Sequence, residues 1–216
     1  SSSAIAGQTL DLLDQPVGQV SWEEAAQFCN WLSDKENLPR FYVFENGRVN
    51  GIMWSSNGYR LPTEAEWAYA AKIRPDGSTA TFSWDKDLFP PDKPVGNYAD
   101  LSASRLVRFA LARYDDGFPV SAPVGSFQAN ARGLYDMGGN VAEWVNDYYD
   151  VQSHRGDPIE DPRGPDEGVK HVIRGASWAL GSRSELRLTY RDSGKDGRLD
   201  LGFRIARYVD VMHDSG

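Results

Sequence analysis

The feature that most constrains this chain is the spacing of glycine, proline and aspartate beyond residue 76. These residues recur every few positions there, so no helix or strand can run for long. The 216 residues include 21 glycines and 12 prolines, and a chain so rich in loops must bury large side chains to offset its conformational entropy. Seven tryptophans, ten tyrosines and nine phenylalanines supply that area at few positions. The sequence therefore predicts ordered loops around an aromatic core.

A first helix is predicted to begin after Ser21. Ser21 and Glu24 form a capping box, in which each side chain accepts a hydrogen bond from the other residue's amide. The helical spacing then predicts one buried stripe, which consists of Ala25, Phe28, Cys29 and Leu32. Because the only cysteine lies in that stripe, we interpret it as a packed thiol rather than a reactive one.

A second helix is predicted to begin after Thr63, which forms a capping box with Glu66. Its apolar face consists of Trp67, Ala70 and Ala71. Pro75 and Gly77 are expected to end it, because neither residue continues a helix readily. Trp22, Trp67 and Trp144 are predicted to lie in the core.

Strands are predicted around Asn46-Gly47, the strongest short signal for a hairpin turn, and again near the C-terminus. The strand-like runs are 41–44, 48–52, 171–173, 186–190 and 203–208, and 102–113 is a candidate helical stretch. No internal repeat, low-complexity tract or linker divides the chain. The sequence thus predicts a single α+β domain over residues 1–216, with two main helices and short antiparallel strands.

Composition and charge exclude several classes of function. The net charge of −8 argues against a surface for nucleic acid, which requires clustered Lys and Arg. No run approaches the about 18 apolar residues of a membrane span, and the first residues lack a signal-peptide pattern. No Gly-x-Ser-x-Gly elbow, phosphate loop or dinucleotide fingerprint occurs, so those enzyme classes are not indicated.

Six sequence blocks stand in an order that resembles one known family. They are residues 20–25 (VSWEEA), 58–67 (GYRLPTEAEW), 122–127 (APVGSF), 133–144 (GLYDMGGNVAEW), 174–178 (RGASW) and 202–204 (GFR). Each block alone is a weak signal, but six in one order are specific. The stretch from about residue 16 to residue 208 resembles the formylglycine-generating enzyme (sulfatase-modifying factor) family.

The resemblance implies a variant of the C-type lectin fold with little regular secondary structure, in agreement with the composition. It also implies a strand segment ahead of the first block, which only about twenty residues precede here. We therefore expect either that this segment has been removed or that a second chain or an upstream segment supplies those strands. The resemblance favours an extracytoplasmic location.

The sequence departs from the family in the residues of two kinds of oxidative metal centre. Family members that make formylglycine bind copper through two cysteines shortly after an Arg-Gly-Gly-Ser block, and Cu(I) requires soft thiolates. No cysteine follows Cys29 here, so that centre is excluded and no copper is expected. Another branch of the family holds iron through histidines of an attached domain. The histidines His154, His171 and His213 lie far apart and include no helical pair.

Calcium is the metal that the resemblance implies, as one or two structural ions. The implied residues are Asn97, Tyr98, Asp116 and Phe118 for one ion, and Asp136, Gly139, Val141 and Glu143 for the other. In each set two side chains and two main-chain carbonyls offer oxygen, which hard cations prefer. The alternative is that residues 115–117 form only a turn and that Glu143 is solvated.

The resemblance places a ligand groove beside the 174–178 block. The residues implied to border it are Ser177, Trp178, Arg183 and Glu185. Arg183 is followed by further arginines at 187, 191 and 204 in an otherwise acidic chain, which favours an acidic or carboxylate-bearing ligand. The alternative is that Arg187, Arg191 and Arg204 form structural ion pairs with Asp and Glu of the loops.

Two functions therefore stay open, and no catalytic residue is predicted. The first is a binding or scaffold module, stabilised by calcium and without the copper oxidase centre, which recognises a peptide, a protein or a small ligand. The second is an oxidoreductase of the same superfamily that acts on a peptide or a peptide-derived natural product. That enzyme would need a different cofactor or a partner subunit.

Overall fold

The computed structural model describes residues 4–84, 89–151 and 159–209. Within them the helices are α1 (Trp22–Lys35) and α2 (Glu64–Lys72), so the predicted α+β architecture with two main helices is confirmed. The strands are β1 (Ala4–Ile5), β2 (Gln8–Thr9), β3 (Tyr42–Glu45), β4 (Arg48–Ile52), β5 (Ala142–Tyr148), β6 (His171–Arg174), β7 (Arg191–Gly194) and β8 (Leu201–Phe203). None of the described helices is long and apolar enough to cross a membrane.

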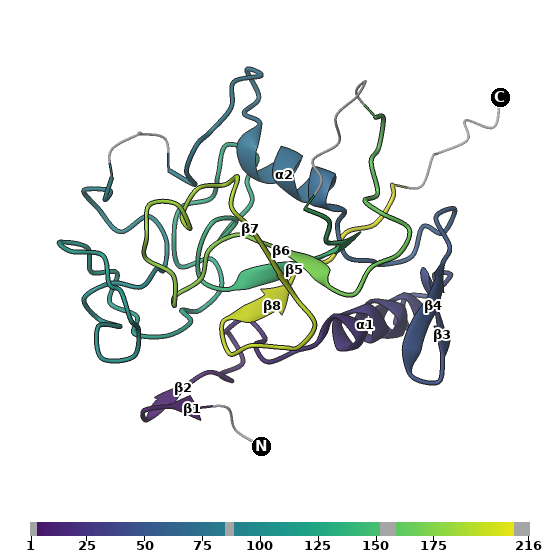
Figure 1. Ribbon diagram of the computed structural model, residues 1–216, viewed down its shortest axis with the longest axis horizontal. Coiled ribbons are helices and arrows are strands. Elements are labelled where there is room, and N and C mark those ends of the chain that lie inside the picture. The colour runs from purple at the N-terminus through teal and green to yellow at the C-terminus, as the bar shows by residue number, and fades with distance from the viewer. Residues whose placement is uncertain (1–3, 85–88, 152–158, 210–216) are drawn as a thin grey trace.

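The central sheet has the strand order β7-β6-β5-β8 and is mixed. β6 runs antiparallel to both β5 and β7, as predicted for the strands. β8 pairs with β5 in parallel, which the sequence did not predict. α2 packs against β5 and β6, while α1 contacts the separate β3–β4 hairpin (Figure 1). β5 was not predicted, because nearly all of its residues are buried and it shows no alternation of polar and apolar side chains.

α1 begins at the predicted capping box but buries a slightly different face. Ser21 Oγ accepts from the Glu24 amide at 3.2 Å, and Glu24 Oε2 accepts from the Ser21 amide at 2.8 Å. Phe28, predicted to be buried, is 41% exposed. Asn30 takes a buried position instead, because its side chain donates to the Tyr42 carbonyl at 2.7 Å and accepts from the Tyr42 amide. The helix is therefore rotated toward its polar contact with β3.

α2 also begins at its predicted capping box but ends earlier than expected. Thr63 Oγ1 accepts from the Glu66 amide at 3.2 Å, and Glu66 Oε2 accepts from the Thr63 amide at 2.8 Å. The helix ends at Lys72 rather than near Pro75. The reason is that Ile73 is extended and forms an isolated β-bridge with Thr79.

The Asn46-Gly47 turn forms as predicted. Asn46 has φ 51° and Gly47 has φ 78°, and a two-residue type I′ hairpin turn requires positive φ at both positions. Glu45 pairs with Arg48 directly beside the turn, so β3 and β4 form the predicted hairpin.

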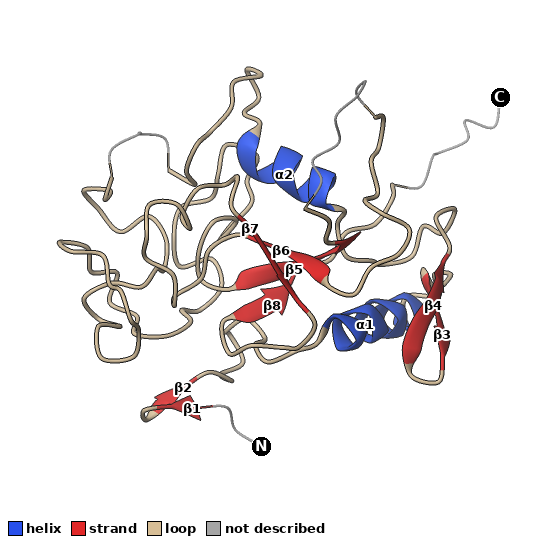
Figure 2. Cartoon of the chain, in the orientation of Figure 1, coloured by secondary structure: helices blue, strands red, loops and turns tan. Residues whose placement is uncertain are grey.

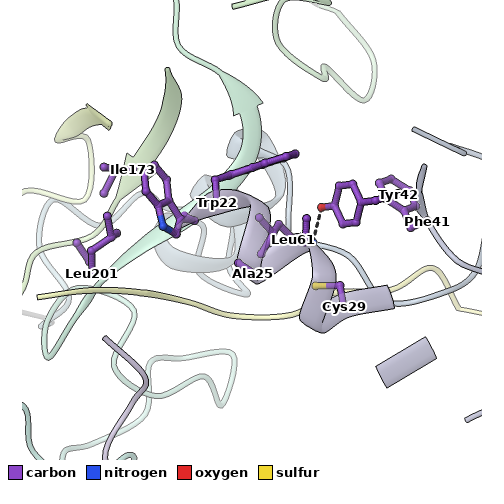
Figure 3. Close-up of a cluster of buried hydrophobic side chains, with 11 residues drawn as sticks. Trp22, Ala25, Cys29, Phe41, Tyr42, Leu61, Ile173 and Leu201 are labelled. Atoms are coloured by element: carbon purple, nitrogen blue, oxygen red, sulfur yellow. Dashed lines mark hydrogen bonds between the residues drawn. The ribbon is translucent and has the colours of Figure 1, made fainter. Parts of the chain in front are cut away.

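The core around the two helices and the central sheet is aromatic, and the ring nitrogens of Trp22, Trp67 and Trp144 each donate a hydrogen bond. Trp22, Trp67 and Trp144 are all at most 3% exposed, as predicted. Trp22 Nε1 donates to the Val145 carbonyl at 2.9 Å, which ties α1 to β5. Figure 3 shows the Tyr42 hydroxyl accepting from the Leu61 amide, a bond of 3.0 Å. Buried aromatic side chains of this kind supply both apolar area and specific hydrogen bonds.

The loop region comprises the described residues between 80 and 141 and those from 175 to 190. It has no helix or strand among those residues and fills the side of the molecule away from β3–β4 (Figure 2). The predicted helix over 102–113 is wrong. Asp100 Oδ1 accepts from the Ser102 and Ala103 amides at 2.8 and 3.2 Å, so the chain enters turns, and Phe109 is 68% exposed.

The strand predicted over 186–190 is also wrong, and the strand of this part of the chain is β7, which starts at Arg191. The carbonyls that a strand would direct to a neighbour bind the buried Arg174 side chain instead, at 2.7 Å for Leu188 and 2.8 Å for Tyr190. Of the run 203–208, only Phe203 belongs to a strand, and Ala206 forms an isolated bridge with Arg60.

Candidate functional site

The first predicted calcium set lies together in the loop region. The Asp116 carboxylate accepts from the Tyr98 amide on Oδ2 and from the Phe118 amide on Oδ1, both at 2.9 Å. Asn97 precedes Tyr98, is fully buried, and donates from Nδ2 to the Val120 carbonyl at 2.7 Å. The structure therefore brings the Tyr98 and Phe118 amides to the Asp116 carboxylate, and Asn97 adjoins Tyr98 in the chain.

An oxygen atom without a partner makes this place suitable for a cation. Asn97 Oδ1 is buried and accepts no hydrogen bond, which is costly without compensation. Burial raises the pKa of Asp116 to about 7, against the opposing effect of the Tyr98 and Phe118 amides. Among the described residues no group of three or more His, Cys, Asp or Glu side chains could hold a metal. A site here would therefore depend on amide and carbonyl oxygens, which suit calcium.

The second predicted set offers fewer free oxygens, because Arg204 binds Glu143. Arg204 Nε donates to Glu143 Oε2 and Arg204 Nη2 donates to Oε1, both at 2.6 Å, and Trp67 Nε1 donates to Oε2 at 2.7 Å. Asp136 Oδ2 accepts from the Gly125 amide at 2.8 Å, while its buried Oδ1 has no partner. Glu143 is thus neither solvated nor open to a metal in this arrangement. One side-chain oxygen is left for a cation here, not two.

Ser177 and Trp178 are both buried in the structure. Ser177 is 0% exposed and donates from Oγ to Asp200 Oδ2 at 2.7 Å. Trp178 is 3% exposed and packs in a cluster with Leu10 and Val141. The chain turns inward just before them, where Gly175 adopts the left-handed φ of 77°. Both side chains therefore stabilise the loop region from within, contrary to their predicted place at the groove.

Arg183 and Glu185 do lie toward the surface of the same segment. Arg183 is exposed, and its guanidinium carbon lies 5.8 Å from the centroid of the Phe89 ring. Glu185 is half-buried, and its Oε2 accepts from the Ser182 amide at 3.0 Å, which closes a turn. A ligand role for these two side chains stays a prediction.

Two of the three arginines with a possible structural role are paired. Arg191 binds Glu64 through Nε at 2.6 Å and Nη2 at 2.8 Å, and Arg204 binds Glu143 as described. Arg187 is exposed and has no carboxylate partner among the described residues. Arg191 and Arg204 therefore form structural ion pairs, as the alternative predicts, but their partners lie in α2 and β5 and not in the loops.

The single cysteine is a packed thiol, as predicted. Cys29 is 0% exposed on the buried face of α1 and lies among Trp22, Phe41 and Leu61 (Figure 3). Burial raises the pKa of the Cys29 thiol to about 12, so a thiolate does not form near neutral pH.

His171 is a core residue as well, whereas His154 and His213 lie outside the described residues. The His171 ring stacks on Trp22 with centroids 3.7 Å apart, and its Nδ1 lies 3.2 Å from the Asn146 carbonyl oxygen. Burial lowers the pKa of His171 to about 4, so the ring is neutral in the folded protein at neutral pH.

A cavity of about 420 Å³ lies beside the end of α2, and sequence reasoning missed it. Its walls come from residues 71–74, from positions between 80 and 95, and from residues 128–132. The basic side chains in its lining are Lys72, Arg74, Lys93 and Arg132. They are spread over three segments, so no spacing pattern in the sequence could have joined them.

Residues 6–209 match the family model described as "Sulfatase-modifying factor enzyme 1-like domain". This chain belongs to the sulfatase-modifying factor family. The match includes both helices, the central sheet and the loop region, so the family drawn from the six sequence blocks is confirmed. The single Cys29 distinguishes this family member from those with a copper-binding cysteine pair.

Relatives of this sulfatase-modifying factor chain carry different names. The formylglycine-generating enzyme of Streptomyces coelicolor is 30% identical over 206 residues, which cover 94% of this chain and 55% of that protein. The chaperone protein LppX of Paenibacillus barcinonensis is 29% identical over 211 residues, which cover 90% and 70%. Among solved structures, Treponema denticola variable protein 1 matches with a TM-score of 0.73 and 30% identity, over 95% of this chain and 74% of that one.

The chain spans about half the length of the formylglycine-generating enzymes that it matches. One sulfatase-modifying factor fold thus occurs in proteins named as an enzyme and as a chaperone. Family membership therefore establishes the fold, and the function must be argued from the residues of the site.

Proposed function

We propose that this chain is a formylglycine-generating-enzyme-like domain that binds a peptide, a protein or a small molecule and does not oxidise cysteine. The observation that carries the proposal is the single thiol. A copper centre of the family type needs two thiolates, and Cys29 is alone, fully buried and protonated at neutral pH. The relationship to a protein named as a chaperone supports a binding role.

In this proposal the binding surface is carried by the loop region of a C-type-lectin-like frame. Such frames hold their loops rigidly from within, so exposed loop residues can contact a ligand without disturbing the core. Ser177 and Trp178 contribute to the interior, and the exposed Arg183 and the neighbouring Glu185 contribute to the surface. An exposed guanidinium suits a carboxylate of the ligand.

One calcium ion stabilises the loop region in this proposal, at Asn97, Tyr98, Asp116 and Phe118. The support is the unpartnered Asn97 Oδ1 and the buried Asp116 carboxylate, which accepts from the amide of Tyr98, the residue after Asn97. A calcium ion there would give Asn97 Oδ1 a partner, compensate the charge of the buried Asp116 carboxylate and offset part of the entropy of ordering the loops. The second set is left out, because Arg204 already binds both oxygens of Glu143.

The proposed loss of oxidase chemistry is tested by loading the purified chain with Cu(I) and incubating it with a cysteine-containing peptide in air. Mass spectrometry is expected to find no peptidyl aldehyde, and an oxygen electrode no peptide-dependent uptake. Conversion of cysteine to formylglycine by this chain alone would overturn the proposal. Stoichiometric iron or copper retained through purification would favour the oxidoreductase alternative.

The calcium ion is tested by thermal unfolding in calcium and in EGTA. Saturating calcium is expected to raise the Tm by about 5 to 10 °C, because it binds only the folded chain. Asp116→Asn should abolish this shift, while the adjacent Asp115→Asn, which removes the same charge from an exposed side chain, should keep it. Equal calcium shifts in both variants would remove the ion from the proposal.

A further inference from the structure

We propose that the cavity beside the end of α2 binds a small organic anion that carries a flat aromatic ring. The cavity involves none of the calcium residues and neither Arg183 nor Glu185. The inference therefore goes beyond the proposed function and stands on separate observations. At about 420 Å³ the cavity has the size of ordinary small-molecule sites.

One wall of the cavity is aromatic. Phe82 and Trp84 both line it and stack on each other, with ring centroids 4.5 Å apart and an angle of 8° between the planes. Both side chains are largely buried, at 2% and 8% exposed, so their positions are fixed by packing. Ala71 and Ala80 line the same cavity and leave room beside the rings. A flat apolar ring is the group that such a wall accommodates best.

The polar part of the lining is strongly basic. Among the described residues that line it, Lys72, Arg74, Lys93 and Arg132 are basic and only Asp92 is acidic, so these residues carry a net charge of +3 in a chain of net charge −8. Within the described part of the chain, neither Lys72 nor Lys93 has an ion-pair partner. The cavity therefore attracts an anion, although the molecule as a whole repels one.

Arg132 is held in place before any ligand arrives. Its Nε donates to the Ile73 carbonyl at 2.7 Å, and its guanidinium carbon lies 4.2 Å from the centroid of the Tyr69 ring. The loop that carries it is fixed to α2 by Asn130, whose Nδ2 donates to the Ala70 carbonyl at 2.9 Å. The terminal nitrogens of Arg132 donate to no acceptor among the described residues. A fixed guanidinium with free donors suits a carboxylate, sulfonate or phosphate at little ordering cost.

Hydrogen bonds to the carbonyls at the C-terminal end of α2 reduce their repulsion of a bound anion. Carbonyls at a helix C-terminus are often unpaired and repel anions. Here four of them already accept hydrogen bonds, from the Ile73 amide, Asn130 Nδ2, the Ala80 amide and Arg132 Nε, at the carbonyls of Tyr69, Ala70, Lys72 and Ile73. The cavity thus presents cationic side chains without competing carbonyl oxygens from these residues.

The test compares two fluorescent probes with the same ring system. Anilinonaphthalene sulfonate has the flat rings and one anionic group, and N-phenyl-1-naphthylamine has the rings without the charge. We expect the anionic probe to bind one site at about 0.15 M salt, and Lys93→Gln and Arg132→Gln to weaken it by about tenfold each. The neutral probe should be unaffected by either substitution. Trp84→Leu should weaken both probes.

Arg48→Gln is the matched control, because it removes the same charge from an exposed position on β4. It should leave the affinity for the anionic probe unchanged. An equal loss in Arg48→Gln, or no loss in Lys93→Gln and Arg132→Gln, would overturn the proposal. Displacement of the probe by a hexaglutamate peptide at lower concentration than by naphthalene sulfonate would also overturn it, in favour of an acidic peptide. Calcium and copper are absent from this assay, so its outcome is independent of the proposed function.

Discussion

The two regions of this molecule satisfy their backbone in different ways. In the regular region, which comprises α1, α2, the β3–β4 hairpin and the central sheet, amides and carbonyls pair within helices and between strands. In the loop region, polar side chains take over that role. The Tyr114 hydroxyl accepts from the Val95 and Gly96 amides at 2.9 and 3.2 Å and donates to the Gly96 carbonyl. Buried backbone N–H and C=O groups must be hydrogen-bonded in either region. The stability of the loop region therefore depends on a few individual side chains, whereas that of the regular region depends on repeated main-chain hydrogen bonds.

Asn140 is the clearest such residue. Its Oδ1 accepts from the Ala122 amide at 2.9 Å and from Asn97 Nδ2 at 3.3 Å, and its Nδ2 donates to the Ala122 carbonyl at 3.1 Å. Its main chain bonds to Asn97 and Trp178 as well. One 2% exposed side chain thus holds together three segments of the loop region.

The comparison predicts that the same substitution costs much more stability in the loop region than in the hairpin. Asn140 and Asn46 both have positive φ, 71° and 51°, so glycine suits the backbone at either position. Asn140→Gly is expected to cost about 4 kcal/mol, because it leaves several buried polar groups unpaired. Asn46→Gly, in the exposed hairpin turn, should stay within about 0.5 kcal/mol of the parent. Urea unfolding measures both, and similar values would break the comparison.

A second prediction concerns pH and the regular region. The folded pKa of His171 is about 4, below its ordinary value of 6.5, so the unfolded chain binds more protons between these values. His171 therefore makes the protein less stable as pH falls from 6.5 to 4, by up to about 3 kcal/mol. Asp147, whose pKa burial raises to about 6, acts in the opposite direction.

The contribution of His171 is isolated by comparing the parent with His171→Phe, which keeps an aromatic ring against Trp22. Denaturant unfolding at several pH values is expected to show a smaller loss of stability toward pH 4 in the variant. If the stability of the two proteins changed with pH in the same way, the buried His171 imidazole would not have the lowered pKa that its burial predicts.

The smallest predicted effect concerns the cap of α1. Ser21→Ala removes the acceptor for the Glu24 amide and should cost about 1 kcal/mol. Ser104→Ala, at an exposed loop position, should be neutral within the error of the unfolding midpoint. A neutral Ser21→Ala would show that packing alone fixes the start of the helix.

The sequence predicted the elements that depend on neighbouring residues, and it did not predict the elements that depend on contacts with distant side chains. The capping boxes at Ser21 and Thr63 and the Asn46-Gly47 turn act within a few residues, and all three formed as predicted. β5 is buried too completely to alternate, and Asp100 diverted the expected helix into turns.

The site shows the same division. The residues around Asp116 came together as the family resemblance implies, but the pairing of Glu143 with Arg204 crosses 61 positions and has no local signal. The lining of the cavity beside α2 is equally dispersed, because it is assembled by the loops and not by any one element.

Hydrogen–deuterium exchange with calcium and with EGTA tests the central claim most directly, namely that a cation completes the loop region and not the regular one. Calcium is expected to slow exchange by about tenfold or more at the amides near Tyr98, Phe118 and Asn140, and to leave α1 and the β3–β4 hairpin unchanged. Exchange that is identical with and without calcium, or slowed equally in both regions, would contradict the account.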